Sequence, residues 1–148
     1  MVYAVKADGK GGVWVGTNNW LSYYDADRDA FRNYRCPQKE EDVRVMQIAD
    51  VDDSRLLVNT SAGLYVFHVA DTSFVQSGLP ADLFRLEATA IYRSKDSLYI
   101  GAKDGLWMYS FASRTLEHLH ALPLGRKEIL TLLQHGNHLW IGTEGDGL

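Results

Sequence analysis

The chain repeats itself about every 42 residues, and this period constrains the fold more than any other feature of the sequence. Each copy contains a short apolar run that leads into a glycine or an asparagine. The four runs are Val13–Thr17, Leu56–Thr60, Leu98–Ala102 and Leu139–Thr143. Their equivalent positions Gly16, Asn59, Gly101 and Gly142 are spaced by 43, 42 and 41 residues. A fixed period of this length, made of short β-type runs and turns, indicates an array of small sheets.

Each copy divides into four short runs separated by turns that are rich in Asp, Gly, Ser and Asn. The predicted strands of the three complete copies are 2–5, 13–17, 21–24 and 31–34, then 45–48, 56–60, 63–67 and 74–76, then 88–91, 98–102, 105–109 and 116–119. The fourth copy contains 129–132 and 139–143, and it reaches Gly147–Leu148, where its third strand would begin. The glycine-containing runs are apolar at consecutive positions, as expected for strands that are covered on both faces.

These observations predict an all-β fold, a β-propeller fragment of about three and a half four-stranded blades. The predicted blades span 1–42, 43–86, 87–127 and, as a half blade, 128–148. All three prolines, Pro37, Pro80 and Pro123, fall in the connections between copies, which supports this division. Residues 40–49 and 81–90 could each form a helical turn, but the register of the repeat favours strands over helices there.

An open arc of blades would leave an apolar blade face uncovered at each end. Propellers typically close with about four to eight blades, and closure protects those faces. We therefore expect the chain to be part of a larger propeller or to associate with another copy of itself. The aromatic residues of the repeated run, Trp14, Tyr99 and Trp140, are expected to pack between stacked sheets.

Composition excludes several classes of partner. The net charge is −4, with acidic and basic residues interspersed and no basic stripe, so we expect no nucleic-acid partner. The single Cys36 permits no internal disulfide. The longest apolar stretches fall far short of a membrane span, and no signal peptide is recognisable at the N-terminus of this sequence. A link to a membrane would come only through parts of a parent protein that this sequence does not contain.

The repeated pattern resembles the two-component regulator propeller repeat. That pattern is an apolar strand, an Asp/Gly turn, Leu-Trp-Ile-Gly-Thr, a few polar residues, Gly-Leu, and then aromatic-x-Asp. Here it reads Val13–Thr17 through Leu21 to Tyr24–Asp25, and Leu139–Thr143 with Gly147–Leu148. The second copy departs from it at Asn59 and the third at Ala102. The resemblance covers nearly the whole chain.

The resemblance implies a function. Members of that family form the periplasmic sensor domain of hybrid two-component histidine kinases, which sense oligosaccharides and signal to transcription. It implies that this chain is non-catalytic and that a kinase module lies elsewhere in the parent. Two alternatives stay open, a propeller that binds other proteins and a carbohydrate-active propeller enzyme. The Asp and Glu residues fall mainly in repeated turns, which disfavours the enzyme.

The candidate ligand-binding residues are Asn18, Asn19 and Trp20, in the turn between the second and third strands of the first copy. The other copies have glycine where Trp20 stands, at Gly63, Gly105 and Gly147. Asparagine can supply the left-handed conformation that glycine would otherwise provide. A tryptophan in this turn, which we expect on the face where the central channel opens, could stack on a sugar ring.

Other residues suggest weaker alternatives. His118 and His120 are two apart in a predicted strand and therefore share a face, but two imidazoles do not complete a metal site. Cys36 precedes Pro37 in a loop, and nothing marks it as a nucleophile. The turn that begins at Asp8 is expected to be a plain hairpin. We expect no metal, no cofactor and no catalytic residues.

Overall fold

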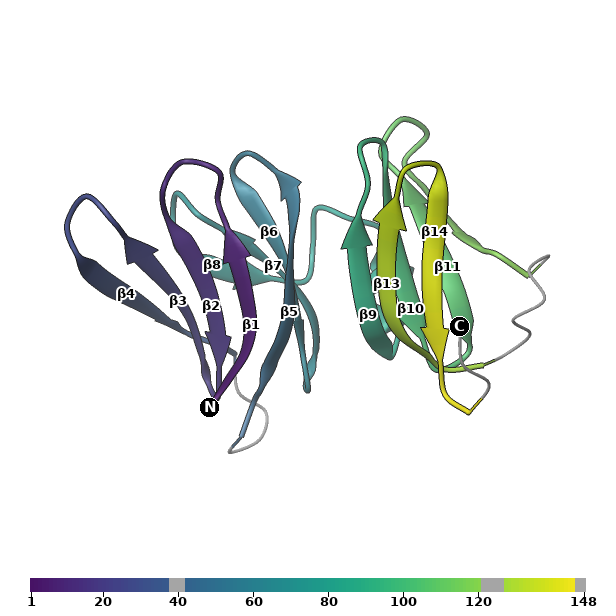
Figure 1. Cartoon of the computed structure of the whole chain (residues 1–148), viewed down its shortest axis with the longest axis horizontal. Helices are drawn as coiled ribbons and strands as arrows, with labels where there is room; N and C mark the ends of the chain where they lie inside the picture. Colours follow the sequence, from purple (N-terminus) through teal and green to yellow (C-terminus); the bar gives the residue numbers. More distant parts are fainter. Residues whose placement is uncertain (38–41, 121–126, 146–148) are drawn as a thin grey trace. The chain divides into compact units, whose positions relative to one another are not determined.

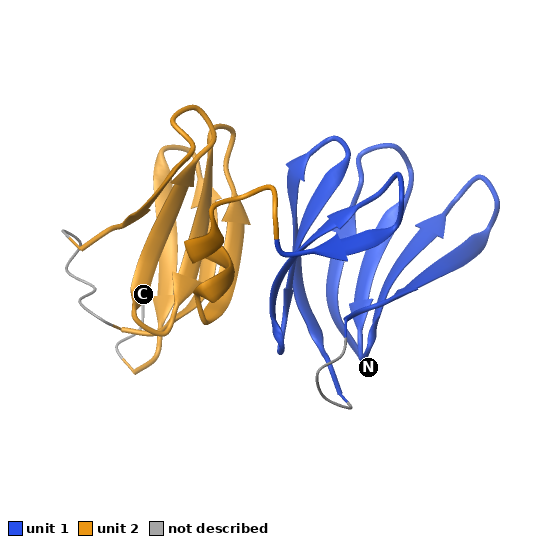
Figure 2. Cartoon of the chain, turned by 180° about the vertical axis from the view of Figure 1, so that it is seen from behind, with its two compact units in different colours: residues 1–76 blue, residues 77–148 orange. Residues whose placement is uncertain are grey.

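The computed structural model describes residues 1–37, 42–120 and 127–145. It divides into two compact units, residues 1–76 and residues 77–148, coloured separately in Figure 2. Throughout the described residues the regular structure is antiparallel sheet, apart from one short 3-10 helix. No helix in the part of the chain that the structure describes is long and apolar enough to cross a membrane. The all-β prediction is confirmed.

Unit 1 contains two four-stranded sheets in which consecutive strands pair (Figure 1). Sheet 1 consists of β1 (Val2–Ala7), β2 (Val13–Thr17), β3 (Trp20–Asp25) and β4 (Ala30–Arg35). Sheet 2 consists of β5 (Val45–Asp52), β6 (Arg55–Thr60), β7 (Gly63–His68) and β8 (Ser73–Val75). The strands begin and end within a few residues of the runs that the repeat predicts.

Unit 2 contains a third four-stranded sheet and a two-stranded one (Figure 1). Sheet 3 consists of β9 (Ala88–Arg93), β10 (Ser97–Ala102), β11 (Gly105–Ser110) and β12 (Thr115–His118). Sheet 4 consists of β13 (Ile129–His135) and β14 (His138–Thr143). Three four-stranded sheets and one pair match the predicted three and a half sets. The boundaries of the blades between these sheets stay a prediction.

Within each unit, the first strand of one sheet packs beside the first strand of the next, β1 beside β5 and β9 beside β13. The repeated glycine permits this approach. A Cβ atom built on Gly16 would lie 2.6 Å from Val45 Cγ1, and one on Gly101 would lie 2.5 Å from Ile129 Cγ2. Glycine at this position therefore accepts the β-branched residue that opens the next sheet.

The core of unit 1 lies between sheets 1 and 2. It joins Trp14, Leu21 and Cys36 of the first repeat to residues of sheet 2, with Tyr23 and Tyr34 packed at its edge. The members from sheet 2 and the segment before it are Val43, Val45, Ile48, Leu56, Val58, Phe67 and Phe74. Trp14 is 5% exposed, so the prediction that it packs between stacked sheets is confirmed. Tyr99 is half-buried against the corresponding core of unit 2.

Trp140 does not follow that prediction, since its side chain is 52% exposed. It occupies the same place in β14 as Trp14 in β2, but β13 and β14 form the last sheet that the structure describes. The face that bears Trp140 points away from sheet 3. In the same way Trp14 of sheet 1 faces the sheet that follows it, and the described residues contain no sheet after β14. The motif creates the apolar surface, and only a neighbouring sheet can bury it.

One connection also differs from expectation. Ala81–Arg85 form a short 3-10 helix after Pro80, and β9 begins only at Ala88. The preference for strand over a helical turn in residues 81–90 was therefore wrong for the first half of that segment. Leu83 is fully buried, which explains why the turn is compact. Pro37 and Pro80 lie in connections as predicted. Pro123 and the third strand expected at Gly147–Leu148 lie outside the described residues.

Candidate functional site

The turn between β2 and β3 contains the three predicted binding residues. Asn18 and Asn19 form a two-residue turn, and Trp20 begins β3. Asn19 has a φ of 66°, in the left-handed region. The equivalent hairpins reach positive φ at glycine instead, 119° at Gly63 and 126° at Gly105. The prediction that asparagine takes over the role of glycine here is confirmed.

Asn19 also ties this turn to its surroundings. Its Oδ1 accepts a hydrogen bond from the Val43 amide at 2.9 Å, and its own amide donates to the Val43 carbonyl. Its carbonyl accepts from the Cys36 amide at 2.9 Å. Bonds to two separate segments hold the turn in one conformation. Asn19 therefore positions the turn.

Asn18 borders the segment that leads into sheet 2. It forms an isolated antiparallel bridge with Arg44. Its side-chain Oδ1 is enclosed and has no hydrogen-bond partner in the described structure. An enclosed acceptor without a donor costs about 1–3 kcal/mol.

Trp20 lies on the opposite face of sheet 1. Its neighbour Leu21 is buried in the core shared with sheet 2, and side chains alternate along a strand, so the indole of Trp20 points away from that core. The side chain is 41% exposed, and Arg35 is its direct cross-strand partner. The turn thus presents an aromatic surface beside a cation, while Asn18 and Asn19 hold the turn from the other side.

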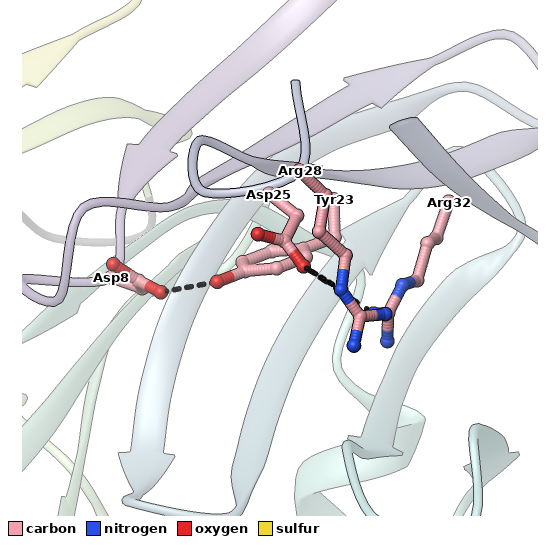
Figure 3. Close-up of polar contacts among 5 residues, drawn as sticks. All are labelled: Asp8, Tyr23, Asp25, Arg28 and Arg32. Atoms are coloured by element: carbon pink, nitrogen blue, oxygen red, sulfur yellow. Dashed lines mark hydrogen bonds and ion pairs between the residues drawn. The ribbon is translucent and has the colours of Figure 1, made fainter. Parts of the chain in front are cut away.

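Polar side chains organise the other end of sheet 1, where the β1–β2 and β3–β4 turns lie (Figure 1). Asp8 Oδ1 accepts from the amides of Lys10 at 2.7 Å and Gly12 at 2.9 Å, and its Oδ2 accepts from the Tyr23 hydroxyl at 2.8 Å. Figure 3 shows this bond beside the ion pairs of Asp25, one of which joins Arg32 at 3.3 Å. These bonds close a hairpin, as predicted for this turn.

Replacing Asp8 with alanine is expected to lower the free energy of unfolding by about 1–3 kcal/mol, because three donors lose their acceptor. The bond from the Lys10 amide, followed by that from Tyr23, lowers the pKa of Asp8 below its ordinary 3.8. The stabilisation is therefore complete above about pH 4 and is lost as the pH falls through the lower, folded-state pKa. Urea unfolding between about pH 2 and pH 6 measures it.

Tyr23→Phe is the matched control for this prediction. It keeps the ring, which packs 4.7 Å from Trp14 between centroids, and removes only the hydroxyl donor. We expect a smaller loss that also shrinks in acid. An Asp8→Ala variant that loses as much stability at pH 2 as at pH 6 would show that the carboxylate is not the stabilising group.

The structure also describes the surroundings of Cys36 and of the pair His118 and His120. Burial raises the pKa of the Cys36 thiol to about 11, so the thiol stays protonated at neutral pH and is a poor nucleophile. His118 and His120 do share a face, with ring centroids 3.9 Å apart. His118 also stacks on Trp107 at 4.4 Å with an interplanar angle of 9°. The described residues contain no cluster of three or more His, Cys, Asp or Glu that could hold a metal ion.

Sequence reasoning did not anticipate the stack of Trp107 on His118. The strand register could have revealed it, because these two residues are direct partners across β11 and β12. Trp107 Nε1 in turn donates to Asp104 Oδ1 at 3.0 Å, which anchors the indole to the hairpin turn.

The fold of this chain is similar to that of several solved structures. No protein-family model matches the chain, and no curated protein matches it. The extracellular domain of the hybrid two component system BT4673 from B. thetaiotaomicron matches with a TM-score of 0.76 and 22% identity, over 97% of this chain and 19% of that one. The extracellular domain of BT3049, from the same organism, matches at 0.72 and 22% identity over 99% of this chain and 20% of that one.

The WD40 beta propeller domain of Doa1 also matches, with a TM-score of 0.69 and 12% identity over 97% of this chain and 48% of that one. These likenesses establish the fold. The chain is a β-propeller fragment, as predicted. It spans about a fifth of the two extracellular domains and about half of the Doa1 chain, so it covers only part of the propellers it matches.

Proposed function

We propose that the chain is part of the periplasmic sensor domain of a hybrid two-component histidine kinase and that it binds an oligosaccharide. The observation that carries the proposal is the fold match to the extracellular domains of two hybrid two component systems over nearly the whole chain. The Leu139–Thr143 and Val13–Thr17 repeats, which resemble the regulator propeller repeat, support it independently.

The turn Asn18–Trp20 is the proposed binding element. Trp20 offers a partly exposed indole whose face can cover the apolar side of a sugar ring. Arg35, its cross-strand neighbour, can hydrogen-bond to hydroxyl or carboxylate oxygens at the edge of that ring. Asn18 and Asn19 hold the backbone that presents the indole.

The proposed role is non-catalytic. Binding changes signalling only if the ligand has unequal affinity for two arrangements of the parent's ectodomain, and the phosphotransfer chemistry belongs to a kinase module of the parent. The ring to which this fragment belongs is completed by further blades of the parent or by another copy of the chain.

Replacing Trp20 with alanine is expected to weaken oligosaccharide binding about tenfold, which corresponds to about 1.4 kcal/mol. Isothermal titration calorimetry would use hexasaccharides of cellulose, xylan and arabinan and, as an acidic set, of chondroitin. Trp140→Ala is the matched control, because it removes another partly exposed indole, 52% exposed against 41% for Trp20, from a different sheet. Equal affinity of the Trp20→Ala and wild-type chains would contradict the site.

The genomic surroundings of the coding region test the proposed class of protein. We expect the reading frame to be associated with histidine kinase and response-regulator modules downstream. A reducing-sugar assay on the same polysaccharides should show no hydrolysis. Turnover that is abolished by one Asp or Glu substitution would contradict the sensor proposal and favour a propeller enzyme.

A further inference from the structure

Among the described residues, two apolar sheet faces have exposed residues at the two ends of the series of sheets. We call the first the leading face; it lies on sheet 1 and consists of Val2, Val5, Val13, Val15, Tyr24 and Phe31. Val5 and Phe31 are 68% and 61% exposed. We call the second the trailing face; it lies on sheet 4 and consists of Leu133, Trp140 and Gly142, with Leu133 58% exposed. Exposed apolar surfaces of this kind usually mark interfaces.

The strand registers relate the leading face to a surface that is already buried. Gly16 pairs with Leu21 and Asn59 with Leu64, which aligns sheet 1 with sheet 2 position by position. The six residues of sheet 2 equivalent to the leading face are Val45, Ile48, Leu56, Val58, Phe67 and Phe74. All six belong to the core that receives Trp14. Even the aromatic pairs correspond, with Tyr24 and Phe31 5.0 Å apart and Phe67 and Phe74 4.7 Å apart.

The trailing face repeats part of the surface that packs into that core, namely the part that β1 and β2 contribute. Trp140 is equivalent to Trp14, whose ring lies 5.6 Å from that of Phe67. Gly142 is equivalent to Gly16 and Gly101, which accept Val45 and Ile129 respectively. The residue equivalent to Val45 and Ile129 at the start of β1 is Val2, and Val2 is exposed.

The distribution of charged residues is compatible with the same contact. Between sheets 1 and 2, Lys6 pairs with Asp50 at 2.7 Å. The registers make Leu133 equivalent to Lys6 and Ala7 equivalent to Asp50. Where the internal interface has an ion pair, the proposed contact would therefore have Leu133 of the trailing face and Ala7, the cross-strand partner of Val13 in the leading face. No charge would be buried without a partner at this point.

We propose that a second copy of this chain docks head to tail, with the trailing face of one copy on the leading face of the next. The contact continues the interface between sheets 1 and 2. It is heterologous, because each face complements the other and not itself. It does not depend on the proposed sensor function. It also leaves the Trp20 position at the margin, because a Cβ on the equivalent Gly63 would meet only Gln76 within 4 Å.

Sedimentation velocity over about a hundredfold range of concentration tests the proposal. We expect the mass of the wild-type chain to rise from 16.7 kDa to at least twice that value. Val5→Asp, in the leading face, and Trp140→Asp, in the trailing face, should each remain monomeric. Val69→Asp, which changes an exposed apolar residue outside both faces, should associate as the wild type does. Circular dichroism confirms that each variant is folded.

Mixing the two monomeric variants distinguishes this geometry from a symmetric one. Val5→Asp keeps an intact trailing face and Trp140→Asp keeps an intact leading face, so an equimolar mixture should form a pair. A wild-type chain that stays monomeric, a mixture that does not associate, or a Val69→Asp chain that fails to associate would each overturn the proposal. The first of these results would assign the two faces to other blades of a parent protein.

Discussion

Replacing Trp14 with alanine is expected to lower the free energy of unfolding of unit 1 by about 3–5 kcal/mol. The side chain is 5% exposed and fills the space between sheets 1 and 2. Its ring lies 4.7 Å from Tyr23, 6.1 Å from Tyr34 and 5.6 Å from Phe67 between centroids. Truncation removes these aromatic contacts and leaves a cavity that two paired sheets cannot close. Urea unfolding followed by circular dichroism measures the loss.

Trp140→Ala is the control that isolates the effect of burial. The two tryptophans occupy the same position of the repeat, but Trp140 is 52% exposed. At concentrations at which the chain is monomeric, we expect its replacement to cost less than about 1 kcal/mol. Equal losses for the two variants would mean that the repeat position, rather than the neighbouring sheet, determines the contribution of the indole.

Replacing Gly101 with alanine is expected to lower the free energy of unfolding of unit 2 by about 1–3 kcal/mol. A Cβ at this position would lie 2.5 Å from Ile129 Cγ2, 2.6 Å from Ile129 Cβ and 3.2 Å from Ala90 Cβ. Ile129 and Ala90 are fully buried, so neither has solvent to move into. Sheets 3 and 4 must separate slightly, and the core between them loses contact. Thermal or urea unfolding of the variant measures the effect.

A double-mutant cycle with Ile129→Ala tests the cause. Ile129→Ala alone should cost about 2–5 kcal/mol, because it empties a buried site. Combined with Gly101→Ala, it frees the space that the new methyl group needs. The double variant should therefore lose about 0.5–3 kcal/mol less than the sum of the two single losses. Strict additivity would show that the clash between Gly101 and Ile129 is not what destabilises the single variant.

Most of the strands could be predicted because their signals are local. The glycine-containing runs, the polar hairpin turns and the interruptions by Pro37 and Pro80 each depend on a few neighbouring residues. Strand was wrongly preferred to a helical turn at Ala81–Arg85, because the repeat carries no information about the connections between its copies. Burial of Leu83, a tertiary contact, favours that compact turn.

The candidate site could be predicted only in part. The absence of glycine at Trp20 identified the turn, and the left-handed conformation of Asn19 follows from local chemistry. The hydrogen bonds from Asn19 to Val43 and Cys36 join segments that are distant in the sequence, so the spacing of residues along the chain does not predict them. The cross-strand position of Arg35 beside Trp20 depends on the register of β3 and β4.

The repeat alone determined the identity, order and pairing of the strands, because hydrogen-bonded hairpins form between neighbours in sequence. It also determined that each sheet carries apolar residues on both faces. Only the tertiary structure decided which of those faces are buried. Trp14 and Trp140 belong to the same motif, but one meets a neighbouring sheet and the other meets solvent. Burial is a property of what lies next to a residue in space, and a periodic sequence specifies the surface without specifying its neighbour.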